Sequence, residues 1–138
     1  MAANSEIILN STSHPSDSTP TSVTGDKFKG AGYYGFGQSS HTVEFEITGF
    51  IGVLKIQGTL ASDPQSTDWF DVSLLGENSF SVDTTGLVSA NNTTVKQVTH
   101  SVANTSVKIY NFTGNFTWVR AVVEDWTYGT VNRVLLNH

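Results

Sequence analysis

The most informative part of the sequence is residues 41–60, which read HTVEFEITGFIGVLKIQGTL. In its first half, the apolar residues Val43, Phe45 and Ile47 alternate with polar ones, and the second half repeats this pattern. A period of two is typical of a β-strand with one buried and one solvated face. The two glycines of residues 49–52 lie between the halves and predict a turn. This stretch therefore predicts two consecutive strands joined by a short connection.

The same pattern continues along the rest of the chain. Further strands are predicted at residues 6–9, 69–75, 95–100, 106–110, 116–123 and 130–137, separated by polar or glycine-containing turns such as 61–68, 111–115 and 124–129. No segment shows a 3.6-residue apolar period, so we expect almost no helix. Many short strands with regular turns predict an all-β fold, an antiparallel two-sheet β-sandwich of jelly-roll-like form. The core residues predicted on this basis are Val43, Phe45, Ile47, Leu54, Ile56, Phe70, Val72, Ile109 and Val122.

The N-terminal part of the chain differs in composition from the rest. Of the sixteen residues 11–26, nine are Ser or Thr and two are Pro, which cannot build a core. We therefore divide the chain into residues 1–30, an N-terminal strand and an extended Ser/Thr/Pro-rich arm, and residues 31–138, the β-sandwich domain. Any order in the arm is expected to come from contacts with its own domain or with a neighbouring subunit.

Composition argues against several classes of partner. The 138-residue chain has a net charge of −5, and its seven Lys and Arg are scattered. Nucleic-acid binding needs clustered positive charge, and an acidic chain is repelled by anionic lipid, so neither partner is expected. There are no cysteines, which excludes disulfides and thiolate chemistry. Residues 1–6 lack the basic and apolar regions of a signal peptide, which predicts synthesis in a cytoplasm without export.

Residues 30–37, which read GAGYYGFG, superficially resemble a phosphate-binding loop. They do not fit the GxxxxGK[ST] pattern, and no strand–loop–helix context surrounds them. We interpret them as a turn whose aromatic residues Tyr33, Tyr34 and Phe36 pack on a sheet edge or on an adjacent chain.

Three acidic residues, Asp63, Asp68 and Asp71, lie in or beside one predicted loop next to Trp69. Such a group can bind calcium, or can act as a catalytic pair across a cleft. The sequence favours a third interpretation, in which these are solvated loop carboxylates and Asp68 caps the loop with its side chain.

No other constellation supports catalysis. The chain has four histidines: His14, His41, His100 and His138. Their spacing in the sequence does not match that of metal ligands. No GxSxG nucleophile motif occurs. We therefore expect no enzyme activity, no cofactor and no metal.

The tryptophans suggest contact sites. Trp118 lies within a predicted strand and is expected in the core, whereas Trp126 and Tyr128 lie in the predicted turn 124–129 and are expected to be exposed. Exposed aromatic rings in a turn serve either as anchors of a protein interface, which we favour, or as a platform for sugar rings.

Two motifs carry a family resemblance. Residues 54–64 read LKIQGTLASDP and are followed at 68–72 by DWFDV, and residues 112–121 read FTGNFTWVRA. Together they resemble small β-sandwich virion structural proteins of tailed phages, of the T4-like cyanophage type. The resemblance covers residues 41–75 and 107–137, about half of the chain. Carbohydrate-binding and discoidin-like sandwiches share a similar rhythm.

This resemblance implies a non-enzymatic structural component of a virion, made in the host cytoplasm and assembled on the capsid, neck or tail as a decoration, cement or adaptor protein. Its implied partners are other virion structural proteins, including further copies of itself. The alternative is a carbohydrate-binding module that aids host attachment, with a host glycan as ligand. The candidate assembly or ligand contacts are Tyr33, Tyr34, Phe36, Trp126 and Tyr128.

Overall fold

The structure is a computed structural model that describes residues 5–15, 17–35, 39–76, 79–82, 88–91 and 94–138. The elements in these ranges are β1 (Glu6–Leu9), β2 (Thr12–Ser13), β3 (Thr21–Thr24), β4 (Phe28–Lys29), α1 (Ala31–Tyr34), β5 (Ser40–Thr59), β6 (Phe70–Asp71), β7 (Leu74–Gly76), β8 (Ser79–Val82), β9 (Val88–Asn91), β10 (Thr94–Val95), β11 (Val98–Thr113) and β12 (Trp118–Asn137).

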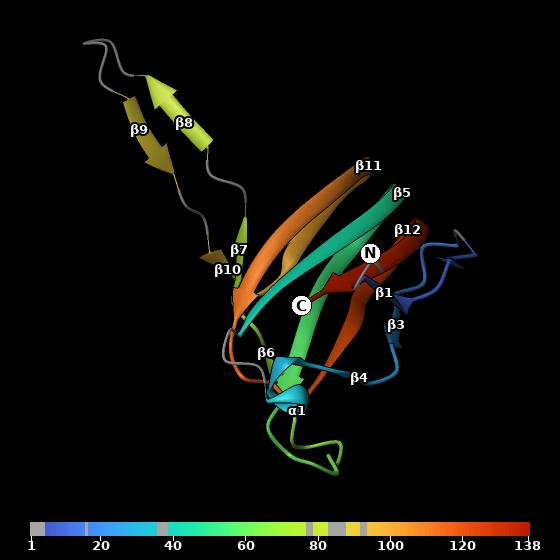
Figure 1. Ribbon diagram of the computed structural model, residues 1–138. Helices are drawn as coiled ribbons and strands as arrows, with labels where there is room; N and C mark the ends of the chain where they lie inside the picture. Colours follow the sequence, from blue (N-terminus) through green and yellow to red (C-terminus); the bar gives the residue numbers. More distant parts are fainter. Residues whose placement is uncertain (1–4, 16, 36–38, 77–78, 83–87, 92–93) are drawn as a thin grey trace.

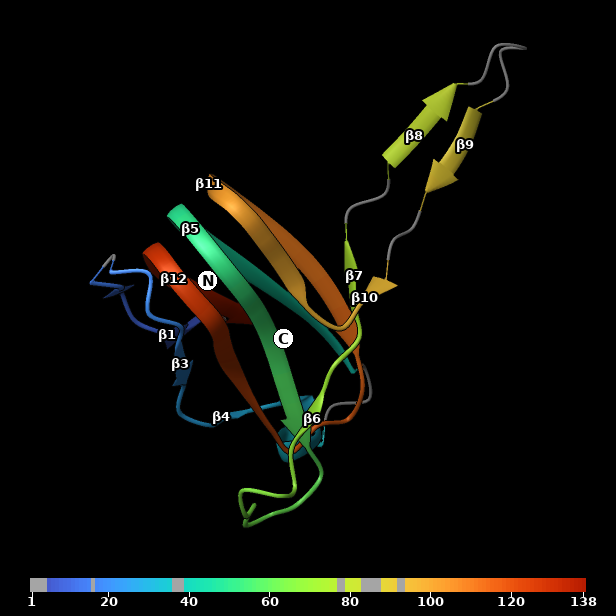
Figure 2. The same ribbon diagram turned by 180° about the vertical axis from the view of Figure 1, so that it is seen from behind.

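The predicted all-β antiparallel fold is confirmed. One sheet runs in the order β1-β12-β5-β11-β7-β10, while β2, β3 and β4 pair with β12 and β6 pairs with β5. The helix α1 is a single turn of four residues. Strands β8 and β9 form a separate two-stranded hairpin that projects from the body of the molecule (Figures 1 and 2).

The sandwich is made by bending this sheet on itself. Strands β5, β11 and β12 each run from one end of the molecule, bend, and return (Figure 1). The bends lie level with one another, since Ile51 of β5 pairs with Tyr128 of β12 and the register of both β5 ladders shifts nearby. The left-handed backbone of Asp125 (φ 48°) and Gly129 (φ 89°) marks the bend in β12. The two layers are therefore the two halves of the same long strands.

This arrangement corrects the turns expected at residues 49–52 and 124–129. Each lies inside a continuous strand and is a bend rather than a hairpin turn. Adjacent strands bend at the same level, so their hydrogen-bonded pairing resumes beyond the bend. The sequence of one strand does not reveal whether its neighbours bend with it.

The core lies between the two halves. Val43, Phe45 and Ile47 face it from the first half of β5, and Leu54 and Ile56 from the second. The other core predictions are confirmed for Val72 and Val122, which are buried, but are wrong for Phe70 and Ile109, which are 45% and 39% exposed. Ile109 lies on the outward face of β11, and Phe70 lies at the rim, with its ring 5.5 Å from that of Phe116.

The bend has its own packed centre around Trp126. This side chain is only 1% exposed, so the prediction that it projects from a turn is wrong. Its ring lies 6.1 Å from that of Phe50, and its Nε1–H donates to the carbonyl of Tyr128 at 2.9 Å. The close approach of the strands requires glycine at position 52, where a Cβ would lie 3.0 Å from the Cα of Trp126. The bend is thus fixed by a buried aromatic pair and by glycine.

The N-terminal arm owes its order to contacts with its own domain. Strands β1, β2, β3 and β4 all pair with β12. Ile8 is 2% exposed and belongs to the core. His14 packs its ring 5.4 Å from that of Trp126, and its Nε2 lies 2.8 Å from the carbonyl of Thr19. The arm therefore covers the edge of β12 with strand pairing that its composition alone does not predict.

Candidate functional site

The end of the sandwich opposite the bend is built around α1. Gly30 and Gly32 donate their backbone N–H groups to the carbonyls of Thr117 and Phe116 at 3.0 and 2.9 Å. A Cβ at Gly32 would lie 2.2 Å from the carbonyl oxygen of Asn115, so only glycine allows this approach. The glycine-rich motif thus docks the backbone of one short turn onto the start of β12. Phe36 lies outside the described residues.

His41 supports this turn from inside. Its Nε2 accepts the N–H of Ala31 at 3.1 Å, and its Nδ1 lies 3.0 Å from the carbonyl of Ser39 and donates to it. Burial lowers the pKa of His41, which favours the neutral ring that this pattern requires. The ring stacks on Phe112 at 4.6 Å. His41 is therefore a structural residue that fixes α1.

This turn presents two tyrosines at the surface. Tyr33 and Tyr34 are 47% and 46% exposed, and their ring centroids lie 5.6 Å apart. Trp118, expected in the core, instead lies partly exposed on the outer face of β12, with its ring 5.1 Å from that of Tyr33. The alternation of β12 places Val119 inside, and so turns the neighbouring Trp118 outward.

Three aromatic rings of this region each pack against the charged group of a lysine or arginine. Lys27 Nζ lies 4.5 Å from the ring centroid of Trp118, and Lys29 Nζ lies 4.6 Å from that of Tyr33. The guanidinium carbon of Arg120 lies 4.1 Å from the ring centroid of Trp69. Trp118 and Arg120 are two residues apart on β12 and share its outer face. We call these six residues the cation–aromatic strip: Lys27, Lys29, Tyr33, Trp69, Trp118 and Arg120.

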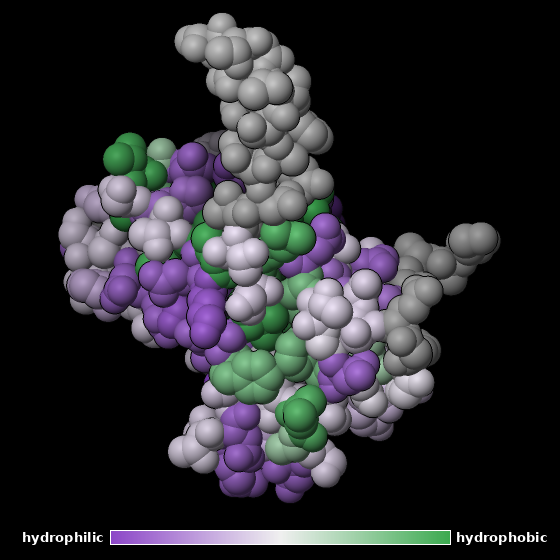
Figure 3. Space-filling view, turned by 90° about the vertical axis from the view of Figure 1, so that its left-hand side faces the viewer, coloured by the Kyte–Doolittle hydropathy of each residue, from purple (hydrophilic) through white to green (hydrophobic). Residues whose placement is uncertain are grey.

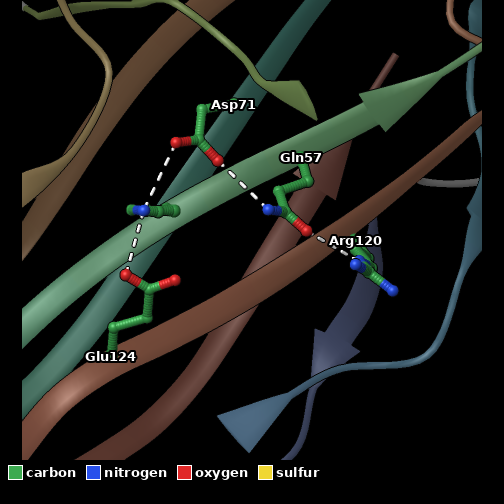
Figure 4. A network of polar contacts seen from close by, with 5 residues as sticks. Gln57, Asp71, Arg120 and Glu124 are labelled. Carbon is green, nitrogen blue, oxygen red and sulfur yellow. Dashed lines mark hydrogen bonds and ion pairs between the residues drawn. The ribbon is translucent and has the colours of Figure 1, made fainter. Parts of the chain in front are cut away.

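A polar network continues from the strip along the same outer face (Figure 4). Arg120 Nε donates to Gln57 Oε1 at 2.9 Å, and Gln57 Nε2 donates to Asp71 Oδ1 at 3.1 Å. Lys55 Nζ lies 3.3 Å from Asp71 Oδ2 and 2.9 Å from Glu124 Oε2. These side chains come from β5, β6 and β12, so the network ties three strands together.

The network also sets the protonation of its members. The hydrogen bond to Glu124 raises the pKa of Lys55. Burial works against ionisation of Asp71, but the hydrogen bonds from Gln57 and Lys55 outweigh it and lower the pKa of Asp71. Both groups are therefore charged at neutral pH, and Lys55 is compensated by two carboxylates.

The three loop carboxylates do not converge. Asp68 Oδ2 accepts the backbone N–H of Gln65 at 2.7 Å, which confirms the predicted loop cap, whereas Asp71 belongs to the network above. Across the part of the chain that the structure describes, no group of three or more His, Cys, Asp or Glu is placed to hold a metal ion.

The edge of β11 is a second candidate surface. β11 pairs with β5 along its length, but among the described strands only β7 pairs with its other edge, at Tyr110 and Asn111. Beyond this contact, Val102 is 76% exposed and Val107 is 57% exposed. A hollow of about 240 Å³ lies where β7 ends, lined by Gly76, Val107, Lys108, Ile109 and Tyr110.

Figure 3 views the side of the molecule on which β11, β7 and β6 lie in Figure 1. Hydrophobic surface runs through the middle of this face, between polar areas on either side. Large apolar side chains that are exposed on or next to these strands include Leu60, Phe70, Leu75, Val107 and Ile109.

The predicted contact residues thus fall in different places. Tyr33 and Tyr34 lie together beside α1, whereas Tyr128, 40% exposed, lies at the bend, where Ser18 Oγ donates to its hydroxyl at 3.1 Å. Trp126 is buried beneath it. The long edge of β11 was not predicted, because residues 95–100 and 106–110 were predicted as two separate short strands.

Comparisons with known proteins give a likeness of fold only. No family model matches the chain, and no curated protein matches it. Among solved structures, the SPBc2 prophage-derived protein YomS is similar over 96% of this chain and 88% of its own, with a TM-score of 0.50 and 13% identity. A family 29 carbohydrate-binding module, CBM29_1 from Piromyces equi, aligns over 100% of this chain and 93% of its own, with a TM-score of 0.45 and 8% identity.

Within the described ranges, no helix has the length and apolar character needed to cross a bilayer.

Proposed function

We propose that this protein is a non-enzymatic structural component of a tailed-phage virion, which assembles on the capsid, neck or tail through contacts with other virion proteins and with copies of itself. The observation that carries the proposal is the long edge of β11, which among the described strands is paired only by β7, at Tyr110 and Asn111. Supporting it are the sequence motifs that resemble phage virion sandwiches and the fold shared with a prophage-derived protein.

The edge has the properties of an assembly surface. A long strand edge offers backbone donors and acceptors to an incoming strand, and soluble proteins usually block such edges with charge or proline. Over its sixteen residues, β11 contains no proline, and its only Lys or Arg is Lys108. Exposed Val102 and Val107 would be buried by an added strand. The hollow lined by Gly76, Val107, Lys108, Ile109 and Tyr110 would receive side chains of that strand.

The proposal is tested by placing charge on this edge. Val107→Lys is expected to fold, because the side chain is already exposed, and to lower the copy number in purified particles of the encoding phage at least tenfold. Quantitative mass spectrometry of the particles measures this. Ile7→Lys, at a position that is 45% exposed on β1 at the opposite edge of the sheet, is the matched control and should leave occupancy unchanged.

Two results would contradict the proposal. One is the absence of the wild-type protein from purified particles. The other is an equal copy number for wild type and Val107→Lys, which would remove the edge of β11 from the assembly contact.

The second candidate function, carbohydrate binding, is supported by a different part of the molecule, the cation–aromatic strip.

A further inference from the structure

The chain is acidic overall, but its cations are not evenly distributed in space. Four of its seven Lys and Arg residues lie on one outer face of the sheet, which is formed by β4, the first half of β12 and the second half of β5. These four are Lys27, Lys29, Lys55 and Arg120. Lys55 is paired with two carboxylates. Within the described part of the chain, the other three have no carboxylate within ion-pair distance and lie against aromatic rings instead.

These contacts leave the cations available. An exposed cation–π pair is weaker than a charged hydrogen bond between a cation and a carboxylate. A ligand that brings its own anionic group can therefore draw Lys27 or Lys29 off its ring at a net gain. The same movement uncovers the faces of Trp118 and Tyr33.

An uncovered ring face favours a particular kind of ligand. The apolar face of a pyranose ring packs on an aromatic ring, and its hydroxyls need polar groups at the side. Gln57 and Asp71 supply such groups beside Arg120 on the same outer face. An acidic peptide would form ion pairs with the cations, but it has no sugar rings to pack on the aromatic side chains and no regular hydroxyl groups to bond with Gln57 and Asp71.

We propose that the cation–aromatic strip binds an anionic polysaccharide, one whose sugar units carry carboxylate or sulfate groups. Lys27, Lys29 and Arg120 bind the anionic groups, and Tyr33, Trp118 and Trp69 pack on the sugar rings. The site is separate from the edge of β11, so the inference stands independently of the proposed role in assembly.

The spacing of the strip fits a chain ligand rather than a single sugar. The rings of Tyr33 and Trp118 lie 5.1 Å apart, and two residues of β12 carry the strip on to Arg120 and Trp69. Strand geometry makes that step about 6.6 Å. The strip therefore offers more than one ring along the strand, which suits a chain of sugar units better than a single sugar.

The test is calorimetric titration of the full chain with an oligogalacturonate and with dextran sulfate at low salt. Saturable binding is expected for at least one, weakening as salt rises. The fully methyl-esterified oligogalacturonate has the same sugar backbone but no charge, and it serves as the control. Where the free acid binds, the ester should bind at least tenfold more weakly. Failure of both anionic probes to bind would overturn the proposal.

A pair of matched variants separates the site from overall charge. Lys27→Gln with Lys29→Gln should weaken binding at least tenfold, whereas Lys108→Gln with Arg133→Gln removes the same charge elsewhere and should change it less than twofold. Equal losses in the two variants would mean that only net charge matters, which would overturn the site.

Two further measurements identify the partner. Trp69→Ala should weaken binding of the same glycan although it changes no charge, and an unchanged affinity would contradict ring packing. Poly-glutamate should bind more weakly than the glycan, and tighter binding of poly-glutamate would assign the strip to an acidic polypeptide. Val107→Lys should bind the glycan normally, so failure of the assembly proposal and failure of this one are distinguishable.

Discussion

The two ends of the sandwich use tryptophan in opposite ways. At the bend, Trp126 is 1% exposed and packs against Phe50, where glycine brings the strands together. At the other end, Trp118 lies on the outer face of the same strand, between Lys27 and Tyr33.

This difference shows which end of the molecule must be tightly packed for folding and which end keeps aromatic rings at the surface for contact with a partner. The bend must be apolar and tightly packed, because three strands change layer there and no loop can relieve an error. The end that carries α1 is held by backbone hydrogen bonds and by His41, so the rings of Tyr33 and Trp118 are not needed to fill the core. They remain at the surface, where they can bind a ligand.

The largest expected effect contrasts the two tryptophans. Trp126→Ala should lower the free energy of unfolding by about 3–5 kcal/mol, because it leaves a cavity in a packed centre. Trp118→Ala should cost less, about 1–2 kcal/mol, because that ring is partly exposed and loses one hydrogen bond, from its Nε1–H to the carbonyl of Ser62, and its contacts with Tyr33 and Lys27. Chemical denaturation of both variants measures the difference. Similar losses would mean that the two ends are equally part of the core.

A second contrast uses glycines with left-handed backbone. At Gly129 (φ 89°), a Cβ would lie 2.3 Å from the carbonyl oxygen of Gly49, whereas at Gly35 (φ 69°) nothing lies within 4 Å. Gly35→Ala should therefore lower the free energy of unfolding by about 1–2 kcal/mol, because the only penalty is that of a left-handed backbone at alanine. Gly129→Ala adds a backbone clash and should cost about 2–4 kcal/mol. Thermal unfolding tests the order, and a larger loss at Gly35 would contradict the packing of the bend.

The smallest effect concerns the network between the two ends. The pKa of Asp71 is lowered in the folded state, so its carboxylate adds stability above the ordinary value of 3.8, and this contribution is lost as the pH falls through the folded value. Wild type should thus be slightly more stable than Asp71→Asn at neutral pH, and the gap should close in acid. Asp63→Asn removes the same charge from an exposed loop and is the control. A gap that widens in acid would contradict the network.

The sequence predicted the strands better than their connections. Alternation identified β5 and the inward faces of Val43 and Leu54, because period two depends only on local burial. It did not distinguish a turn from a bend at residues 124–129, since the bend exists only because β5 and β11 bend beside it. That long-range fact decided the position of Trp126.

The candidate site was predicted only in part for the same reason. Tyr33 and Tyr34 were identified because a glycine-rich stretch exposes its aromatic residues. The cations of the strip come from β12, from β4 and from Lys27 just before β4, which are far apart in sequence from β12, and no local pattern brings Lys27 to Trp118. The open edge of β11 likewise depends on where β7 ends.

The central claim, that the edge of β11 is the assembly contact, is tested most directly by hydrogen–deuterium exchange along residues 98–113 in the free protein and in purified particles. The account predicts fast exchange of edge amides between Val102 and Ile109 in the free protein and strong protection on the particle, while the amides around Trp126 stay protected in both states. Unchanged fast exchange at residues 102–109 on the particle, with protection gained elsewhere, would contradict it.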